Sequence, residues 1–381
     1  MIPQHKIEEV FETARIEEVV EDFIQLKRSG QNLKGLSPWN NEKTPSFMVS
    51  PAKQIFKDFS SGKGGNVVTF LMEAEHFSYP EAIRWLADRY NIDLEEEELD
   101  DEAKEAQNER EQLYLLNQFA LKYFKEQMHE TSEGKSIALG YFKEREFTAK
   151  TIEDFNLGYN PDRWDAFLNH ALDQGYKEEL LLTAGLVKKK GDKLFDGYKG
   201  RVMFPIQNLS GRVLGFGGRV LSQQAKTAKY INSPQSVIYD KSKTLYGLFQ
   251  AKSGIVKQDE VILVEGYTDV MRLHQQGVSI AVASSGTSLT KEQVALIRRY
   301  TKNVTVLFDG DQAGLKAAMR GLDILLEEGM NVKVVPLADG EDPDSFAREK
   351  TAEEITQFID SEKRDFINFK SHFLLGEQPE D

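Results

Sequence analysis

The sequence predicts an α+β multidomain protein: a small β domain with helices, then a mixed α/β basic segment, a parallel α/β sheet and a helical tail. Three observations support this prediction. The chain has 381 residues, enough for roughly two to four domains. Its 40% hydrophobic and 29% charged residues are typical of a globular protein with large cores. In its last third, short apolar runs alternate with helical patterns.

Composition excludes several classes of protein. The chain has no Cys, so disulfides and thiolate metal sites are excluded. No apolar run approaches the roughly 18 to 20 residues that span a membrane, and the polar start Met1–Val10 lacks the apolar core of a signal peptide. We therefore expect a cytoplasmic protein without a membrane partner.

The net charge of −14 hides a strong segregation of charge along the chain. Leu186–Lys257 has 14 Lys and Arg against three Asp and no Glu, a net charge of +11. Asp93–Glu111 has a net charge of −9, and Gln258–Asp381 has one of −10. This pattern indicates a surface that meets a polyanion beside one that holds cations; the alternative is chance clustering on solvated faces.

The first domain is predicted over residues 1–95. Apolar residues recur at helical spacing over Lys6–Phe23 and Tyr79–Tyr90, and the intervening Ser46–Phe59 alternates and is rich in aromatic and β-branched residues. A small antiparallel sheet between helices is therefore expected. Residues 96–112 form an acidic stretch that is too charged to pack, so we expect a linker or an exposed helix start there.

The second segment, residues 113–257, changes from helical to β-type patterning. Leu113–Leu182 has helical spacing, and Leu186–Leu248 has short Val, Ile and Phe runs separated by Gly pairs. Lys188–Lys190 is predicted to be an exposed turn. One core-facing helical stripe is predicted to contain Leu115, Phe119, Tyr123 and Phe124.

Strands that are buried on both faces and alternate with helices predict a parallel sheet over residues 258–340. The expected strands are Val261–Val264, Ile280–Ala283, Val304–Phe308 and Val332–Pro336. The expected helices are Asp269–Gln276, Lys291–Tyr300 and Ala313–Glu328. Residues 341–381 are predicted to form a helical tail, with a helix over Ile359–Leu375.

Acidic residues directly follow two of the predicted strands. Glu265 follows the first strand, and Asp309 and Asp311 follow the third. Because ligands of a parallel sheet bind at the carboxyl ends of its strands, these side chains are expected to converge. Oxygen ligands without His or Cys favour Mg²⁺ or Mn²⁺ over Zn²⁺. The rim of this metal site is predicted to include Asp269, Asp342 and Asp344.

Each acid has a simpler interpretation. Asp309 and Asp311 flank Gly310 and could form only a turn, and Asp269 could only begin a helix, since Asp suits both positions. The simpler interpretation weakens for Glu265, Asp309 and Asp311 taken together, because all three stand at strand ends.

The motifs EGYTD, DGDQAG and GEDPDS, in this order on this scheme, resemble the Toprim domain shared by bacterial primases, topoisomerases and some nucleases. Upstream, KGLSPWNNEKTPSF, GKGGNVVTFL, RVMFPI, GFGGR, KYINSP and YDKSKTLYGL resemble the amino-terminal and polymerase domains of the bacterial replicative (DnaG) primase family. The resemblance covers essentially the whole chain. It implies that 113–257 is the basic part of a polymerase domain, 258–340 its Toprim domain and 341–381 its helical tail.

The first domain departs from the family pattern, which is a zinc ribbon with Cys-x-x-His and Cys-x-x-Cys ligands. One carboxylate, two hydroxyls and an amide cannot make a structural zinc site of the usual kind, so no zinc is expected. The four ligand positions hold Ser37, Asn40, Asp58 and Ser61. The metal-free ribbon is predicted to be held by Trp39, Phe47, Val49, Ile55, Phe56, Phe59 and Phe70.

The resemblance also implies that the first domain binds single-stranded DNA. Lys27–Lys63 has a net charge of +5, from seven basic and two acidic residues. Phosphate attraction combined with aromatic stacking is how single strands are held, although at least two of the three aromatics are expected to be core residues. The aromatics are Trp39, Phe56 and Phe59, among Lys43, Lys53, Lys57 and Lys63.

The family's basic ridge, which holds template and incoming nucleotide, has counterparts in this chain. They are Lys229, Tyr230, Asn232 and Ser233 in KYINSP, Lys241 in YDKSKTLYG, Arg201 in RVMFP and Arg219 in GFGGR. Arg145 matches the Arg of the family's Arg-Gly pair, but Glu146 replaces the Gly, which puts Arg145 in doubt.

The resemblance implies a DNA-directed RNA polymerase, a primase that joins ribonucleoside triphosphates on a single-stranded DNA template. Asp309, Asp311 and nearby acids would hold divalent ions, and Glu265 would be the general base or a further ligand. Family members also contact the replicative helicase at the replication fork through a carboxy-terminal domain, and we expect this chain, which lacks that domain, to be a truncated monomer. Two alternatives are a DNA-binding module without competent chemistry and another Toprim nuclease or topoisomerase.

Overall fold

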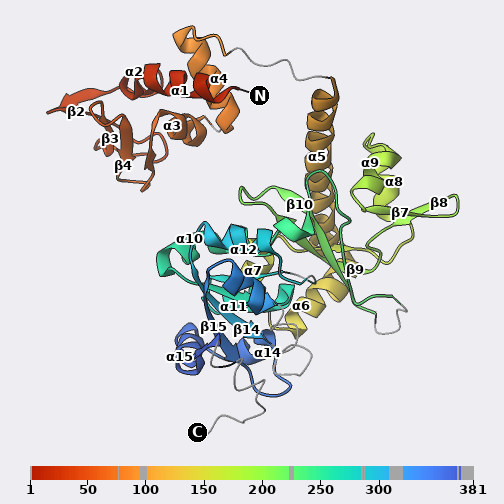
Figure 1. Cartoon of the computed structure of the whole chain (residues 1–381). Coiled ribbons are helices and arrows are strands. Elements are labelled where there is room, and N and C mark those ends of the chain that lie inside the picture. The colour runs from red at the N-terminus through yellow and green to blue at the C-terminus, as the bar shows by residue number, and fades with distance from the viewer. Residues whose placement is uncertain are drawn as a thin grey trace. The chain divides into compact units, whose positions relative to one another are not determined.

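The computed structural model describes residues 2–75, 77–94, 101–222, 227–284, 286, 288–308, 321–366 and 369. The chain divides into two compact units, Met1–Glu105 and Ala106–Asp381 (Figure 1). Helices and sheets occur in both, so the predicted α+β multidomain class is confirmed. Within the described ranges, no helix has the length and apolar character needed to cross a bilayer.

The amino-terminal unit packs helices against a five-stranded antiparallel sheet of order β1-β2-β3-β4-β5. Its core contains Phe47, Phe56 and Phe70, and the rings of the first two stack with centroids 5.5 Å apart. The helices are α1 (Gln4–Thr13), α2 (Ile16–Glu21), α3 (Val67–Ala74) and α4 (Tyr79–Tyr90). The strands are β1 (Lys27–Ser29), β2 (Asn32–Gly35), β3 (Phe47–Ser50), β4 (Ile55–Asp58) and β5 (Gly64–Gly65).

Two expectations for this unit were wrong. The predicted helix over Lys6–Phe23 is two helices, because the backbone is extended at Ala14 and Arg15. Ile55 and Phe59 are not core residues: their exposed fractions are 42% and 70%. Alternate residues of a strand point to opposite faces, so burying Phe56 on β4 turns Ile55 outward, and the same alternation continues to Phe59.

Most of helix α5 (Asp101–Glu130) belongs to the second unit, which also contains an antiparallel sheet of order β11-β10-β9-β6. Its strands are β6 (Gly158–Asn160), β9 (Arg201–Gln207), β10 (Val213–Val220) and β11 (Tyr230–Asn232), and β7 (Val187–Lys190) and β8 (Lys193–Asp196) form a separate hairpin. The helical elements are a π-helix (Gly134–Leu139), α6 (Gly140–Glu144), α7 (Ala149–Asp154), α8 (Ala166–Asp173), α9 (Glu178–Thr183), a 3₁₀ turn (Lys241–Lys243) and α10 (Leu248–Gln258).

The predicted parallel sheet is present, with strand order β13-β12-β14-β15-β16. The first four strands are mutually parallel, and β16 adds an antiparallel edge. The strands are β12 (Val261–Val264), β13 (Ala281–Ala283), β14 (Asn303–Phe308), β15 (Asn331–Pro336) and β16 (Arg364–Asp365). The helices are α11 (Tyr267–Gln275), α12 (Lys291–Arg298), α14 (Pro343–Ala347) and α15 (Ala352–Glu362).

Three further expectations for the second unit were wrong. Leu115 is 63% exposed, because the buried stripe of α5 follows Leu113, Leu116, Ala120 and Phe124. Lys188–Lys190 belongs to strand β7, although it is exposed as predicted. The tail is not one helix over Ile359–Leu375: α15 ends at Glu362 and the chain turns into β16. Residues 313–320 of the expected helix Ala313–Glu328 lie outside the described ranges, and 321–327 are helical.

Candidate active site

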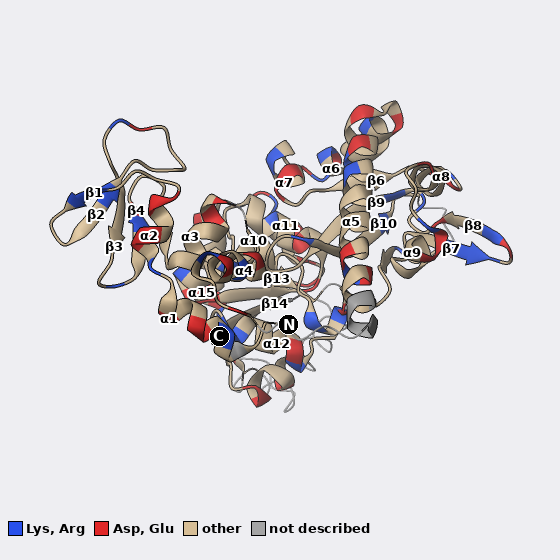
Figure 2. Cartoon of the chain, turned by 90° about the horizontal axis from the view of Figure 1, so that it is seen from above, with Lys and Arg blue, Asp and Glu red and all other residues tan. Residues whose placement is uncertain are grey.

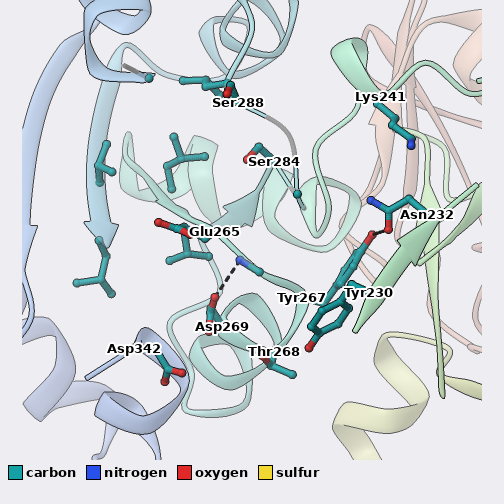
Figure 3. A pocket seen from close by; sticks show the side chains of 18 of the residues that line it. Tyr230, Asn232, Lys241, Glu265, Tyr267, Thr268, Asp269, Ser284, Ser288 and Asp342 are labelled. Carbon is teal, nitrogen blue, oxygen red and sulfur yellow. Dashed lines mark hydrogen bonds between the residues drawn. The ribbon is translucent and has the colours of Figure 1, made fainter. Parts of the chain in front are cut away.

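A pocket of about 690 Å³ lies where the carboxyl end of β12 faces β10 and β11. Figure 3 shows Glu265, Asp269 and Asp342 on one side of it and Tyr230, Asn232 and Lys241 on the other. Its lining includes the acids Glu265, Asp269 and Asp342 and the cations Arg145, Arg219, Lys229 and Lys241. Acidic and basic side chains that are far apart in sequence therefore share one cavity.

The junction of β12 and α11 determines the positions of Glu265 and Asp269. Glu265 directly follows the buried strand and is exposed to the pocket. Asp269 is only 7% exposed and its Oδ2 accepts a hydrogen bond from the Gly266 backbone N–H at 2.9 Å. Asp269 therefore stabilises the start of α11, which was the simpler interpretation of this residue, and it also lines the pocket.

The motif GEDPDS separates its two aspartates. Asp342 caps α14 by accepting the Ser345 N–H at 2.7 Å, and it lines the pocket. Asp344 is fully buried and does not reach the pocket lining. Its Oδ1 accepts from Arg272 Nε at 2.8 Å and its Oδ2 from Arg145. We call Arg145, Arg272 and Asp344 the Asp344 cluster.

Asp309 and Asp311 lie outside the described residues, and their roles remain predictions. Strand β14, which precedes Asp309 in sequence, pairs in parallel with β12 and ends at Phe308. Among the described residues, no three Asp, Glu, His or Cys side chains are grouped closely enough to hold a metal ion. The metal-binding roles of Glu265, Asp269, Asp342 and Asp344 remain predictions.

Arg145 is positioned from several sides. Besides its bond to Asp344, it donates to the Tyr141 hydroxyl at 3.2 Å, and its carbonyl accepts from Arg272. Glu146 has a φ of 58°, the left-handed region that favours glycine, and its carbonyl accepts from Gln275 Nε2 at 2.9 Å. This backbone conformation gives a physical reason for the Gly of the family's Arg-Gly pair.

Arg219 and Tyr230 form the neighbouring part of the pocket wall. They are paired across β10 and β11, and the Arg219 guanidinium lies 5.6 Å from the Tyr230 ring centroid. Arg219 also donates to the Tyr141 hydroxyl and lies 4.8 Å from the centroid of that ring. Tyr141 therefore joins Arg219 to Arg145.

Arg201 and Ser233 were expected on the basic ridge, but neither lines the pocket. Arg201 is 4% exposed, and its guanidinium donates to the carbonyls of Gly218, Ala228 and Lys229, so it ties β10 to the segment that leads into β11. Ser233 is buried, and its hydroxyl accepts from the Phe216 N–H at 3.0 Å. Both side chains are therefore engaged in hydrogen bonds within the fold.

The sequence interpretation missed Arg272 and Tyr267. Arg272 is fully buried in α11 between apolar neighbours, and an Arg on a core-facing stripe was the available signal. Tyr267 lines the pocket and donates to Asn232 Oδ1 at 2.7 Å. Its signal was Gly217 of GFGGR, where an added Cβ would lie 2.5 Å from the Tyr267 ring.

The four zinc-ligand positions of the amino-terminal unit lie close together. The hydroxyls of Ser37 and Ser61 donate to Asp58, which is fully buried, and the Asn40 N–H bonds to Ser37 Oγ at 3.2 Å. Ser46 and Ser60 donate to the same carboxylate at 3.0 Å. We call Ser37, Ser46, Asp58, Ser60 and Ser61 the Asp58 cluster.

Hydrogen bonding keeps Asp58 ionised. Burial alone would raise the pKa of this carboxyl, but the hydroxyls of Ser61, Ser37, Ser60 and Ser46 lower it to about 2. Both carboxylate oxygens accept hydrogen bonds, and no thiolate or imidazole stands at the four positions. These residues do not fit the nitrogen and sulfur donor set of a structural zinc site.

Of the three aromatics considered for stacking, only Phe59 is largely exposed. Phe56 is buried, and the partly buried Trp39 packs against the core and donates Nε1–H to the Glu73 carbonyl at 3.1 Å. Lys63 lies 4.8 Å from the Trp39 ring centroid. Two of the three aromatics are therefore core residues, as expected.

The parallel sheet, with acidic residues at its carboxyl edge, gives the second unit a Toprim-like fold. The family model described as "Toprim-like" matches residues 262–347. Two other models match: "DNA primase catalytic core, N-terminal domain" over 123–252 and "CHC2 zinc finger" over 2–102.

Relatives and solved structures agree with these matches. A DNA primase of Clostridium acetobutylicum is 40% identical over 362 residues, which cover 95% of this chain and 59% of the relative. The crystal structure of the zinc-binding and RNA polymerase domains of Aquifex aeolicus primase has a TM-score of 0.62 and 35% identity, covering 94% of this chain and 86% of that one. A DnaG primase catalytic domain bound to single-stranded DNA has a TM-score of 0.63 and 35% identity, covering 70% of this chain and 83% of that chain.

The chain belongs to the bacterial DNA primase family. It spans about six tenths of the length of the curated relatives that it matches.

Proposed function

We propose that the chain is a primase that makes short RNA primers from ribonucleoside triphosphates on single-stranded DNA, in the cytoplasm during replication. The observation that carries this proposal is that one pocket is lined both by acids of the Toprim-like region and by cations, among them Arg219 of β10 and Lys229, which directly precedes β11. A solved relative bound to single-stranded DNA supports the template as a partner. Family membership supports this reading over a nuclease or topoisomerase.

The proposed reaction forms one phosphodiester bond. The 3′-hydroxyl oxygen of one nucleotide attacks the α-phosphorus of the next, the bond between the α- and β-phosphates breaks, and pyrophosphate leaves. Arg219, Lys229 and Lys241 would neutralise phosphate charge; that all three line the pocket supports this role. Glu265 would take the proton of the attacking hydroxyl or serve as a metal ligand.

The pocket chemistry fits a hard divalent cation, Mg²⁺ or Mn²⁺, because Glu265 and Asp342 bring carboxylate oxygens to it. We propose that Glu265, Asp309 and Asp311 hold this ion. When bound, it would polarise a phosphoryl group as a Lewis acid.

We assign Asp344 a positioning role in place of the metal-binding role expected from the sequence. Both of its oxygens accept from guanidinium groups, and one of these belongs to Arg145, which lines the pocket. Asp344 would then act on the reaction through Arg145. Arg201 and Ser233 would likewise support β10 and β11 without touching nucleotide.

For the amino-terminal unit we propose a zinc-free fold that contributes to binding of the DNA template. The Asp58 cluster supports the first part, and the exposed ring of Phe59 in a basic segment supports the second. Primer synthesis with Mg²⁺ should be unchanged after treatment with a zinc chelator and gel filtration. Loss of activity that added zinc restores would contradict this proposal.

The deciding experiment compares Asp309→Ala with the exposed control Asp173→Ala. With single-stranded DNA, Mg²⁺ and ribonucleotides, Asp309→Ala should abolish dinucleotide synthesis and leave DNA binding nearly intact, while the control should behave as the parent chain. Robust primer synthesis by Asp309→Ala would refute the assignment, and cleavage of the DNA by the parent chain would favour a Toprim nuclease.

A further inference from the structure

The hydroxyl oxygen of Tyr141 is shared by two arginines of the pocket wall. Arg145 Nη1 donates a hydrogen bond to it at 3.2 Å, and Arg219 Nη1 donates to the same oxygen. Both arginines line the pocket, whereas Tyr141 is not among the described residues of the lining. A hydroxyl oxygen has two lone pairs, so it can accept from both guanidinium groups at once.

The ring of Tyr141 contacts the same two arginines. The guanidinium of Arg219 lies 4.8 Å from the ring centroid, and that of Arg145 lies 5.8 Å from it. Both distances are within the range of a cation–π interaction. One tyrosine therefore holds the two cations through its oxygen and through its ring.

The backbone that carries Tyr141 is fixed by close packing. The π-helix directly before α6 begins at Gly134, where an added Cβ would lie 1.9 Å from the Gln127 carbonyl oxygen of α5. Phe142, the next residue after Tyr141, is fully buried, and its ring centroid lies 6.3 Å from that of Phe204 in β9. Figures 1 and 2 show α6 near this sheet. The π-helix is a rare element that occurs frequently at functional sites.

The charges around Tyr141 do not cancel. Arg145 and Arg272 share a single carboxylate, that of Asp344. Among the residues that the structure describes, no other acid pairs with Arg145, and none pairs with Arg219. Three guanidinium groups against one carboxylate give this group a net charge of +2. The neutral hydroxyl of Tyr141 holds two of these cations without neutralising them, so their charge remains for an anion in the pocket.

We infer that Tyr141 is a positioning residue, which sets Arg145 and Arg219 as a pair that binds phosphate groups. Guanidinium groups bind phosphate oxygens through N–H donors in a fixed geometry, so the orientation of the two groups determines the strength of binding. Without the shared acceptor, mutual repulsion and side-chain entropy would favour separated arginines. The inference rests on the proposed function, because the phosphates would be those of a ribonucleoside triphosphate or of a DNA strand.

The test measures the binding of two probes by isothermal titration calorimetry in metal-free buffer. Inorganic tripolyphosphate represents the nucleotide, and an oligothymidylate represents the strand. Tyr141→Phe keeps the ring but removes the shared acceptor, so its affinity for at least one probe should fall roughly five- to tenfold, and the probe affected identifies the source of the phosphates. Tyr141→Leu, which also lacks the ring, should lose more.

The matched control is Tyr114→Phe. The ring of Tyr114 also lies against an arginine, with the Arg212 guanidinium 3.7 Å from its centroid, but neither residue lines the pocket. This variant should bind both probes as the parent chain does.

A double-mutant cycle separates positioning from a general structural role. If the Tyr141 hydroxyl acts through the arginine pair, Tyr141→Phe should cost about threefold or less in an Arg219→Ala background. Unchanged affinity of folded Tyr141→Phe for both probes, or the same loss with and without Arg219, would overturn the inference and leave the proposed function standing. Binding of neither probe by the parent chain would refute both.

Discussion

Asp58 and Asp344 are both fully buried carboxylates at positions that the family resemblance connects with metals, yet their surroundings differ. Asp58 accepts from neutral serine hydroxyls, whereas Asp344 accepts from two guanidinium groups. The first carboxylate holds together the segments that carry the four zinc-ligand positions of the family. The second fixes an arginine in the pocket wall. A buried carboxylate therefore does not by itself identify a metal site; its donors decide its role.

The largest expected effect is that of Asp344→Asn. It leaves Arg145 and Arg272 without their counter-charge, and breaking a buried ion pair costs about 3–5 kcal/mol. Urea unfolding of the chain should show this loss in the second unit, while Asp173→Asn should have no measurable effect. A loss below about 1 kcal/mol would mean that Asp344 does not organise this cluster.

Asp58→Ala is expected to have a smaller effect, confined to the amino-terminal unit. It removes the shared acceptor of several serine hydroxyls, which should lower the free energy of unfolding by about 1–3 kcal/mol. A Trp164→Phe background restricts tryptophan fluorescence to Trp39 and Trp85, so the urea transition reports this unit. Asp88→Ala, at an exposed position of α4, is the control. If both variants lost the same free energy of unfolding, the hydrogen bonds to Asp58 would not be what stabilises this unit.

The pH dependence of stability should have opposite signs in the two units. Hydrogen bonds outweigh burial at Asp58, lowering its pKa from 3.8 to about 2, so its contribution is fully present above pH 3.8 and is lost as the pH falls through about 2. Burial raises the pKa of Asp196 from 3.8 to about 6, so the folded state binds the extra proton and the stability of the second unit falls as the pH rises between these values.

Urea midpoints of the two units, measured across this pH range, check both signs. Asp196→Asn should abolish the decrease in the second unit, and Asp58→Asn should flatten the acid limb of the first. The opposite result would contradict the burial argument: in the parent chain the stability of the second unit would rise between pH 4 and 6, and Asp196→Asn would remove that rise.

The smallest expected effect is that of Glu146→Gly, next to the Asp344 cluster. The φ of 58° at Glu146 strains any residue with a Cβ, and glycine removes this strain. Because glycine also gives the unfolded chain more conformational freedom, the net gain in the free energy of unfolding should be at most about 1 kcal/mol. Thermal unfolding measures the change, and Glu144→Gly, within α6, is a control that should be destabilising. Destabilisation by Glu146→Gly would show that its side chain matters more than its backbone.

The parallel sheet was predictable because its buried strands are continuously apolar. Val261–Val264 is the observed β12, and the other predicted strands of this sheet differ at their first residue only. The break between α1 and α2 was not predictable, since neither Ala14 nor Arg15 is a helix breaker. β16 was missed because a two-residue strand has too few residues to show a period.

The pocket was predictable only in part. Sequence reasoning selected Glu265, Lys229 and Lys241, which line the pocket, by their motifs and strand-end positions. It also selected Arg201, which is buried. A motif cannot distinguish an exposed guanidinium from a buried one, because burial depends on carbonyl groups brought together by tertiary structure. For the same reason the Asp58 cluster was recognisable as lost zinc ligands but not as a bonded group.

The Asp58 cluster bears on how this protein would withstand chemical stress. Cysteine thiolates are attacked by peroxide and hypochlorite, and their oxidation releases a bound metal. The chain has no Cys, and the cluster consists of serine hydroxyls around one carboxylate, which such oxidants leave intact. An oxidative burst or metal starvation would therefore remove no ligand from this cluster, whereas either condition would unfold a thiolate-dependent ribbon.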